Sequence, residues 1–584
     1  GLSALGNNAA LQWNALYTKD PDLKAFLAKI IRYDLEATQT VAPENLRVVA
    51  ATPTTVELRW DPIKYTGEAG GYRVFYGVSP GGPYTFFDET PNKTVSSMTV
   101  TGLDPKSTRY YFAVQAVTYP HKANQTTVVS DFGSEVSVVR GPVDFYFPFY
   151  QSSVDTFTGF AVSNFSGERA NLSFTGFDAS GQPSPALGAL NFSLPPGHQF
   201  AMLGSEFLRS FQAGWVRLIS DNPDIGSFFQ FGATGQLDGS SSIIGQSRKF
   251  YFTRIFEGPN AFRGQHATTF LSIANPNDHA ISLNLTLRGA APDQNGSSTK
   301  VTRTLPAKGW LFEPVSQIFG LTSQASNGYV EAEVISGSGA VGFESIQLPE
   351  SRTLIGLNAS FGNVTDELYS AHLANEQLAF GIAFFTNLKL VNVSDEPRTL
   401  MVRAIYSGGF NLPVDLTLAP GEVLQEDVRD LFGALVPTTS SIRIEASGPG
   451  VIGDVIFGDV FTSRYAAAMP LQTRKFTRAV FSHVANALNF FTGIALYNPG
   501  SRPANVTVEV FSDQGVMTGQ TSFQLGGASR ISKLLAELLP STAGQAGGYL
   551  VVRSTEPLVA QQLFGDAALN FLSAVPPTIV ESAP

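Results

Sequence analysis

The sequence predicts a mainly β protein, in which tandem β-sandwich domains follow a short α-helical segment. Three observations lead to this prediction. The chain has 584 residues, too many for one hydrophobic core, and its 55 Gly, 35 Pro and 45 Phe suit short strands, tight turns and thin aromatic cores. After residue 41, apolar and polar residues alternate with the period of two that is typical of strands. One long pattern also occurs four times, which indicates four homologous domains.

Residues 1–41 differ from the rest because their apolar residues recur at helical spacing. Pro21 directly after Asp20 is typical of a helix start, so we expect two short helices or one helix broken near Pro21. The apolar positions are Leu11, Leu16, Leu23, Phe26, Leu27, Ile30 and Ile31. Two hypotheses stay open: this face packs on the next domain, or the segment is an arm that docks on a neighbouring copy of the chain.

Residues 42–141 are predicted to form the first sandwich, because strands with alternating apolar residues are separated by Gly/Pro turns. The segment resembles a fibronectin type III domain. Trp60 matches the tryptophan on an early strand of that family, and Leu103, Pro105 and Tyr110 match its tyrosine corner, with one extra residue before the tyrosine. The resemblance implies a seven-stranded sandwich used as a spacer or an adhesive module. Because the chain has no Arg-Gly-Asp, integrin binding is not implied.

The remainder of the chain contains four copies of one pattern. Each copy has an Asn followed by a turn and an alternating strand, then a Gly-containing turn, a short amphipathic piece and a closing pair of strands that we expect to form a hairpin. The equivalent asparagines are Asn164, Asn275, Asn392 and Asn498, and the amphipathic pieces are FLRSF, VSQIFGL, VRDLFGAL and ISKLLAELL. The predicted domains are 142–247, 248–366, 367–473 and 474–584. They resemble repeated modules of large exported bacterial proteins, and we expect them to form a row of self-sufficient sandwiches.

Charge and composition restrict the partners. A net charge of −10 without long basic runs argues against nucleic acid and anionic membrane surfaces. No apolar run approaches the length of a membrane-spanning helix, so no membrane span is expected. The chain has no cysteine, which excludes disulfides and thiolate chemistry. The absence of an initiator Met favours a mature exported product, although a trimmed sequence would look the same.

The sequence carries no recognisable catalytic, cofactor or metal site. Its six His are not at metal-ligand spacing, and neither a nucleophile elbow nor a phosphate-binding loop occurs. The segment Asp221-Asn-Pro-Asp224 has oxygen ligands for calcium, but its equivalents in the other copies are Gly-Ser-Gly, Gly-Pro-Gly and Thr-Glu-Pro, which favours a turn. We therefore predict that the protein is not an enzyme.

Asn-x-Ser/Thr triplets are frequent. There are eleven, whereas 27 Asn and the Ser/Thr content predict roughly four or five by chance. They are expected either as glycosylation sites or as a by-product of polar positions alternating along strands. The asparagines are Asn92, Asn124, Asn164, Asn171, Asn191, Asn284, Asn295, Asn358, Asn363, Asn392 and Asn505.

These features favour an extracellular or cell-surface structural protein that assembles with copies of itself into a filament, sheath or layer. Repetition supplies length or equivalent surfaces, and low charge leaves neutral surface that is buried without desolvating ions. In this hypothesis residues 1–41 provide the contact between copies. The alternative is an adhesin or carbohydrate-binding stalk that recognises glycans or other cell-surface components. An accessory part of a secreted hydrolase is the third hypothesis, and nothing in the chain supplies its catalytic domain.

Overall fold

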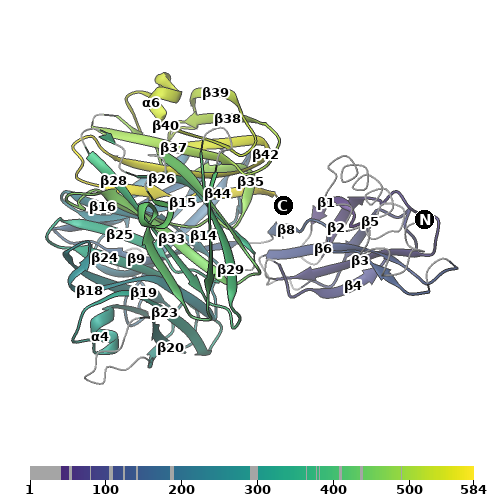
Figure 1. Cartoon of the computed structure of the whole chain (residues 1–584), viewed down its shortest axis with the longest axis horizontal. Coiled ribbons are helices and arrows are strands. Elements are labelled where there is room, and N and C mark those ends of the chain that lie inside the picture. The colour runs from purple at the N-terminus through teal and green to yellow at the C-terminus, as the bar shows by residue number, and fades with distance from the viewer. Residues whose placement is uncertain are drawn as a thin grey trace. The chain divides into compact units, whose positions relative to one another are not determined.

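A computed structural model of the chain describes residues 41–583 apart from short gaps, at 52–54, 79–80, 104–108, 123–124, 140–141, 185–189, 290–299, 363–364, 376–377, 380–381, 407–410, 434–438 and 488. The expected N-terminal helices therefore lie outside the described residues. The structure is mainly β, as predicted, and it divides into two compact units between Val143 and Asp144 (Figure 1).

The first unit is a sandwich of two sheets. One sheet has the order β1-β2-β5 and the other β4-β3-β6-β7, with β8 also pairing with β6. Its strands are β1 (Glu44–Ala51), β2 (Val56–Asp61), β3 (Gly70–Gly77), β4 (Thr85–Glu89), β5 (Ser97–Val100), β6 (Arg109–Thr118), β7 (Val128–Val129) and β8 (Val136–Val139). Trp60 on β2 and Tyr110 on β6 are buried in the core between the sheets, and the Trp60 ring packs edge-on against Tyr72 at 5.4 Å between ring centroids.

The second unit contains the four repeats, named repeat 1 to repeat 4 after their order along the chain. Repeat 1 has the sheets β12-β11-β14-β9-β17 and β13-β10-β15-β16. Its elements are β9 (Val143–Gln151), β10 (Thr156–Asn164), β11 (Ala170–Phe177), β12 (Leu190–Leu194), β13 (Gln199–Leu203), α3 (Gly204–Phe207), β14 (Ala213–Ser220), β15 (Ile225–Ala233), β16 (Gln236–Ser241) and β17 (Ile243–Ile244).

Repeats 2 and 3 keep the same strand order, although in repeat 2 pairing between β18 and β19 joins the two sheets. Repeat 2 comprises β18 (Lys249–Phe262), β19 (Gln265–Ala274), β20 (Ile281–Arg288), β21 (Lys300–Leu305), β22 (Trp310–Pro314), α4 (Val315–Phe319), β23 (Ala325–Ser336), β24 (Val341–Leu348) and β25 (Thr353–Asn358). Repeat 3 comprises β26 (Glu367–Ala374), β27 (Leu378–Ala379), β28 (Ile382–Asn392), β29 (Arg398–Ile405), β30 (Asn411–Leu418), β31 (Val423–Asp427), α5 (Val428–Phe432), β32 (Thr439–Ala446), β33 (Val451–Asp459) and β34 (Ala466–Pro470).

In repeat 4 one long strand, β42, serves both sheets. The elements are β35 (Lys475–Phe481), β36 (Ala485–Asn486), β37 (Phe490–Asn498), β38 (Ala504–Phe511), β39 (Met517–Leu525), β40 (Ser529–Leu534), α6 (Leu535–Leu538), the 3-10 helix η3 (Pro540–Thr542), β41 (Gln545–Ala546), β42 (Tyr549–Asp566), β43 (Leu572–Val575) and β44 (Thr578–Ala583). Three of the four amphipathic pieces of the sequence contain the short helices α4, α5 and α6, whereas FLRSF begins at Phe207, the last residue of α3.

The expected closing hairpins are wrong. In repeat 1, β14 pairs with β11 in one sheet while β15 pairs with β10 in the other, so the Asp221–Asp224 turn carries the chain across the sandwich. β23 and β24, and β32 and β33, likewise pair with other strands and not with each other. The turn residues fit this crossing, since the Asp221 carboxylate accepts hydrogen bonds from the backbone N–H and the side-chain amide of Asn171, at 2.7 and 2.6 Å.

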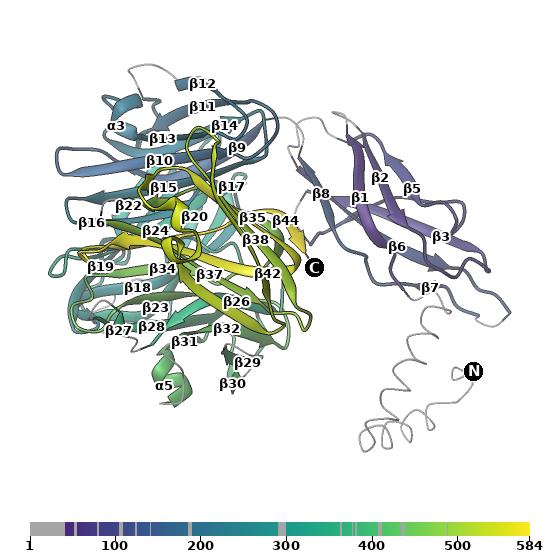
Figure 2. The ribbon, with the colours of Figure 1, turned by 90° about the horizontal axis from the view of Figure 1, so that it is seen from above.

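The expected row of sandwiches is also wrong, because the four repeats close into a ring. The strands β16, β25, β34 and β43, which are equivalent edge strands of the four repeats, meet at its centre, named here the central strands. β16 contacts β25 and β43, and β34 contacts β25 and β43, so each repeat has two neighbours and repeat 4 returns to repeat 1. Figures 1 and 2 show the blue, teal, green and yellow repeats gathered into this one body.

Small residues and one carboxyl group allow the close approach at the centre. A Cβ on Gly356 of repeat 2 would lie 2.8 Å from the Phe231 ring of repeat 1, and one on Gly239 would lie 2.4 Å from the Phe228 ring of its own repeat. Asp238 of repeat 1 is fully buried and accepts a hydrogen bond from the Gly356 N–H of repeat 2 at 2.7 Å. Burial raises the pKa of Asp238 to about 8, so it is mostly a neutral acid at physiological pH.

The repeated asparagines explain why the pattern recurs. Each is fully buried, and its amide nitrogen donates to the backbone carbonyl four residues ahead, at 2.8–2.9 Å, and to carbonyls of the turn before β13, β22, β31 or β40. Its amide oxygen accepts the N–H two residues ahead. One side chain therefore joins two turns that are about thirty residues apart. An apolar side chain at this position would leave the buried carbonyl and N–H groups of both turns without partners.

We predict that Asn498→Ala lowers the free energy of unfolding by about 3 kcal/mol, because it leaves several buried carbonyl and N–H groups without partners. Asn505→Ala is the matched control: Asn505 lies on the exposed face of β38 in the same repeat, and we expect a change below about 0.5 kcal/mol. Denaturant titration of the intact protein measures both. Equal losses in the two variants would contradict the role assigned to Asn498.

Candidate functional site

The structure places the eleven sequence-predicted asparagines in different environments. Asn164 and Asn392 are two of the buried landmark residues, and their amide nitrogens are fully engaged in hydrogen bonds. We therefore expect no glycan at these two positions, in contrast to the sequence-based expectation. Asn92, Asn171, Asn191 and Asn505 are exposed, Asn284 and Asn358 are half-buried, and Asn124, Asn295 and Asn363 lie outside the described residues.

Within the described ranges, no group of three or more His, Asp or Glu residues is arranged to hold a metal ion. No helix in these ranges is long and apolar enough to cross a membrane. Buried polar residues also lie close together where one repeat meets the next, as Arg254 and Asp454 do. These contacts are named the 1–2, 2–3, 3–4 and 4–1 junctions.

Each junction is built on equivalent positions. The residue three places before the landmark Asn pairs across the sheet with a residue of the neighbouring strand, and together they form the receiving pair of that repeat. The receiving pairs are Ala161 and Phe228, Ser272 and Phe343, Lys389 and Asp454, and Ala495 and Gln561. The preceding repeat contributes an incoming residue, which is Phe149, Arg254, His372 or His483. Phe149, Arg254 and His372 each stand three residues after a tyrosine. His483 stands two residues after Phe481, in the same way that Phe149 stands two residues after Phe147.

The chemistry of this contact differs at every junction. At the 1–2 junction the Phe149 ring lies 5.9 Å from that of Phe343. At the 2–3 junction Arg254 Nε donates to Asp454 Oδ1 at 2.6 Å, and both side chains are buried. At the 4–1 junction the His483 ring lies 5.7 Å from that of Phe228. At the 3–4 junction, His372 and Gln561 line a cavity of about 310 Å³ instead.

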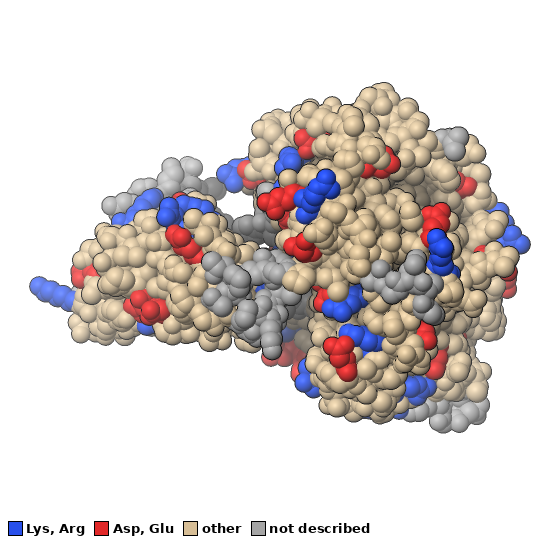
Figure 3. Space-filling view, turned by 180° about the vertical axis from the view of Figure 1, so that it is seen from behind, with Lys and Arg blue, Asp and Glu red and all other residues tan. Residues whose placement is uncertain are grey.

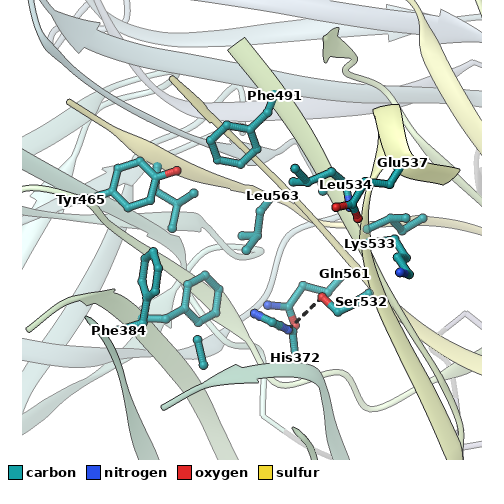
Figure 4. Close-up of a pocket in the computed structure, with 16 residues that line it drawn as sticks. His372, Phe384, Tyr465, Phe491, Ser532, Lys533, Leu534, Glu537, Gln561 and Leu563 are labelled. Carbon is teal, nitrogen blue, oxygen red and sulfur yellow. Dashed lines mark hydrogen bonds between the residues drawn. The ribbon is translucent and has the colours of Figure 1, made fainter. Parts of the chain in front are cut away.

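Figure 4 shows the rings of Phe384, Tyr465 and Phe491 along one side of this cavity and His372, Ser532 and Gln561 grouped on another. Lys533 and Glu537 lie next to each other at a further edge and are exposed. The remaining lining residues are mostly apolar: Ala374, Phe457, Gly493, Ile494, Ala495, Leu534, Leu563 and Leu572. The cavity is thus assembled from β26, β28, β33 and Tyr465, directly before β34, of repeat 3 and from β37, β40, α6, β42 and β43 of repeat 4.

Repeat 4 carries small residues at the cavity where repeat 2 carries large ones, and repeat 1 is also small at these positions, with Gly159 and Ala201. Phe270 and Phe312 stack at 5.0 Å in the 1–2 junction, and by strand register their counterparts in repeat 4 are Gly493 and Ser532. In repeat 3 the same positions hold Asn387 and Gln425. Only part of the volume that two rings occupy in repeat 2 is therefore filled in repeat 4.

Hydrogen bonds and burial set the charge state at the cavity wall. Arg530 Nη2 lies 3.2 Å from His372 Nδ1, and Ser532 Oγ lies 3.3 Å from the same nitrogen. Burial, followed by the repulsion of Arg530, lowers the pKa of His372 to about 3, so its imidazole is neutral at pH 7. Burial also lowers the pKa of Arg530 to about 10, and its Nε donates to Ser441 Oγ at 3.1 Å.

Gln561 is one of the described buried residues whose side-chain hydrogen bonding is incomplete. It is 1% exposed, and its Oε1 accepts from Ser370 Oγ at 3.2 Å, whereas its Nε2 has no partner. An unpartnered buried N–H donor is costly, and this nitrogen is itself fully buried, so the cavity does not expose it. No sequence motif points to this site, because its lining residues are spread from His372 to Leu572.

The comparisons with known proteins concern the first unit. The family model for the fibronectin type III domain matches residues 41–129. Residues 41–129 are a fibronectin type III domain. Among solved structures, an Fn3-like protein from Clostridium thermocellum is 26% identical over 17% of this chain and 91% of its own, with a TM-score of 0.14. An FN3 domain of human collagen XX is 20% identical over 17% of this chain and 88% of its own, with a TM-score of 0.13. No curated protein matches the chain.

The fibronectin type III assignment confirms the sequence-based resemblance. Domains of this type are typical of extracellular proteins, where they occur in structural or adhesive roles, and they are generally non-catalytic. The match ends before β9, so it gives no information on the four repeats or on the cavity.

The 2–3 junction supplies a prediction about pairing. Arg254→Met removes the guanidinium bound to the buried Asp454 and leaves Lys389, its partner across the sheet, as the neighbouring cation, and we expect a loss of about 3 kcal/mol in the free energy of unfolding. Arg254→Met combined with Asp454→Leu copies the apolar type of contact found at the 1–2 junction, and we expect it to recover at least half of that loss. Chemical denaturation of wild type, both single variants and the double variant gives the coupling. Strict additivity of the single losses would contradict the assigned pairing.

Proposed function

We propose that the protein is an exported, non-catalytic structural component of the cell surface. Its four-repeat ring would act as a rigid block and its fibronectin type III domain as a spacer or adhesive module. The observation that carries this proposal is the ring itself, because three-quarters of the chain builds one closed body and the chemistry at its junctions serves contacts between repeats. Catalytic groups instead converge on one pocket with perturbed acids or bases in reach of a substrate.

Ring closure restricts how copies of the chain would assemble. Contacts between unlike faces either close into a ring or continue as an open filament, and here they are already closed within one chain. A filament, sheath or layer would therefore use other surfaces, with residues 1–41 as the candidate contact. The face in Figure 3 supports such assembly, since its charged residues are scattered between wide neutral areas and do not gather into a single-sign patch.

The second candidate function is an adhesin that recognises glycans or other cell-surface components. The fibronectin type III domain favours it, because domains of this type occur in adhesive proteins. Glycosylation of the exposed asparagines Asn92, Asn171, Asn191 and Asn505 is compatible with either role, and both roles suit a bacterial exported protein.

We predict that the native protein is recovered from the cell surface or medium and forms ordered polymers in electron micrographs. Deletion of residues 2–41 is expected to leave folded, dispersed particles, because the ring needs no residue before 143. Val154→Lys is the control, because Val154 is fully exposed and the variant changes the surface while it keeps residues 1–41. We expect this variant to polymerise as the wild type does. Recovery only from the cytoplasmic fraction would contradict export. Undiminished polymers after the deletion would remove the N-terminal segment as the contact.

A further inference from the structure

We propose that residues 23–31 bind, as an amphipathic helix, to an exposed aromatic surface on the fibronectin type III domain of their own chain. This surface, named the aromatic face, consists of Phe75, Tyr84, Phe86 and Phe132. The proposal goes beyond the proposed function and does not depend on polymerisation. A contact of residues 1–41 with a neighbouring copy would first require the segment to leave this face, so the face controls when the segment is available.

The aromatic face lies on the outer side of the sheet that contains β4, β3 and β6 (Figure 1). Tyr72 and Val74 of β3 belong to the core, so the alternation along the strand places Phe75 on the opposite side. The Phe75 ring lies 5.5 Å from that of Phe86, its partner on β4, and 5.1 Å from that of Phe132, which stands between β7 and β8. Phe86 is 51% exposed and Phe132 is 41% exposed, so both rings offer apolar surface to a partner.

The shape of the aromatic face is held by hydrogen bonds and ring contacts. The Tyr84 hydroxyl donates to the Glu135 carboxylate, which also accepts from the Gly81 N–H at 2.8 Å, and the Tyr84 ring lies 5.2 Å from that of Phe132. Adjacent rings of the face stand at 61–88° to one another, so the surface is ridged. Apolar side chains fit between such ridges, whereas a sugar would need a flat ring face for stacking. A fixed surface also loses little side-chain entropy on binding.

The N-terminal segment supplies a matching apolar surface. Its apolar residues between positions 23 and 31 have the spacing i, i+3, i+4, i+7 and i+8, which places them on one side of a helix. They are Leu23, Phe26, Leu27, Ile30 and Ile31. This side of the helix needs a partner, because a short amphipathic helix is stabilised mainly by packing of its apolar side.

The charges of the two surfaces are complementary. Residues 23–33 contain three cations and no Asp or Glu, and the cations are Lys24, Lys29 and Arg32. Exposed carboxylates border the aromatic face, each within two residues of one of its rings or hydrogen-bonded to one, and they are Asp88, Asp131 and Glu135. Such opposite charges orient a partner, while burial of the apolar side chains supplies most of the affinity.

The path of the chain brings the segment to its own aromatic face. A Cβ on Gly133 would lie 2.5 Å from the Pro43 carbonyl oxygen, so the chain enters the domain beside the residue that follows Phe132. The connection through residues 32–42 spans up to about 36 Å when extended, whereas a domain of this size has a radius of gyration of about 13 Å. A short connection also gives the segment a high effective concentration at this face, which favours its own chain over a second copy in dilute solution.

The test uses full-length protein and a fluorescent peptide with the sequence of residues 19–40, followed by fluorescence polarisation. In Phe26→Ser, Leu27→Ser, Ile30→Ser, named the released variant, the segment loses its apolar side and leaves the face free. We expect the peptide to bind the released variant and to bind wild type at least about tenfold more weakly, because the wild-type segment competes. Absence of binding to the released variant, or equal binding to both proteins, would overturn the proposal. Binding of cellohexaose without binding of the peptide would assign the face to a glycan and would also overturn it.

The control for the released variant is Ala25→Ser, Ala28→Ser, which changes the other side of the same predicted helix. It should exclude the peptide as wild type does, since the apolar side is kept. Peptide binding to this control as tight as to the released variant would contradict the assigned side of the segment.

Variants of the face locate the binding. Phe86→Ser and Phe132→Ser, each introduced into the released variant, should weaken peptide binding by about tenfold, because each removes one exposed ring. Phe461→Ser is the matched control, since Phe461 is 76% exposed and lies in repeat 3, and it should leave peptide binding unchanged. Unchanged binding in both face variants would show that the peptide binds elsewhere and would overturn the proposed site.

Sedimentation velocity of dilute wild type separates the chain's own segment from that of a second copy. We expect single particles that exclude the peptide. Exclusion of the peptide only in samples that self-associate would assign the segment to a neighbouring copy and would overturn the proposal. Absence of polymers in electron micrographs would instead contradict the proposed function and would leave these binding results unaffected.

Discussion

The four central strands, β16, β25, β34 and β43, determine the organisation of residues 144–584. Each is the edge strand of its sheet, and an edge strand exposes unpaired backbone groups and the apolar face beside it. In this protein the four edges are buried against one another, with small residues at the contact and the carboxyl group of Asp238 accepting hydrogen bonds from the N–H groups of Gly239 and Gly356 inside the ring. No repeat has this protection by itself, and so the four repeats depend on each other.

Closure also explains why four copies of one fold carry different side chains at equivalent positions. If every junction used the same contact, any repeat would fit any other, and chains would pair with each other or in the wrong order. An aromatic pair, an ion pair, a histidine–glutamine cavity and a histidine–phenylalanine contact make each junction distinct. Mismatched pairs would bury an unpaired charge or leave a void, which is how unlike interfaces are kept specific. The cavity at the 3–4 junction follows from the same variation.

Features that depend on residues close together in the chain could be predicted from the sequence. Trp60 and Tyr110 predicted the first sandwich, and the spacing of the landmark asparagines predicted four related domains, because each of those side chains organises turns within its own repeat. The sequence-based predictions were wrong where a feature depends on contacts between residues that are far apart in the chain. A turn such as Asp221–Asp224 suits a hairpin and a crossing between sheets equally well, and alternation along a strand does not tell which neighbour it pairs with. The ring and the cavity need residues of different repeats, so no single stretch predicts them.

The most direct test of ring closure is the distance between repeats 1 and 4 in solution. In the ring, Gln199 N donates to Asp513 O at 2.8 Å and the Tyr549 hydroxyl donates to Gly197 O at 2.9 Å. Because the chain has no cysteine, His198→Cys with Gln514→Cys allows two spin labels to be placed selectively for pulsed electron paramagnetic resonance. The ring predicts a distance at the short limit of the method. Four domains in a row, each with a radius of gyration of about 13 Å, would hold the labels several domain diameters apart, and that result would contradict the account.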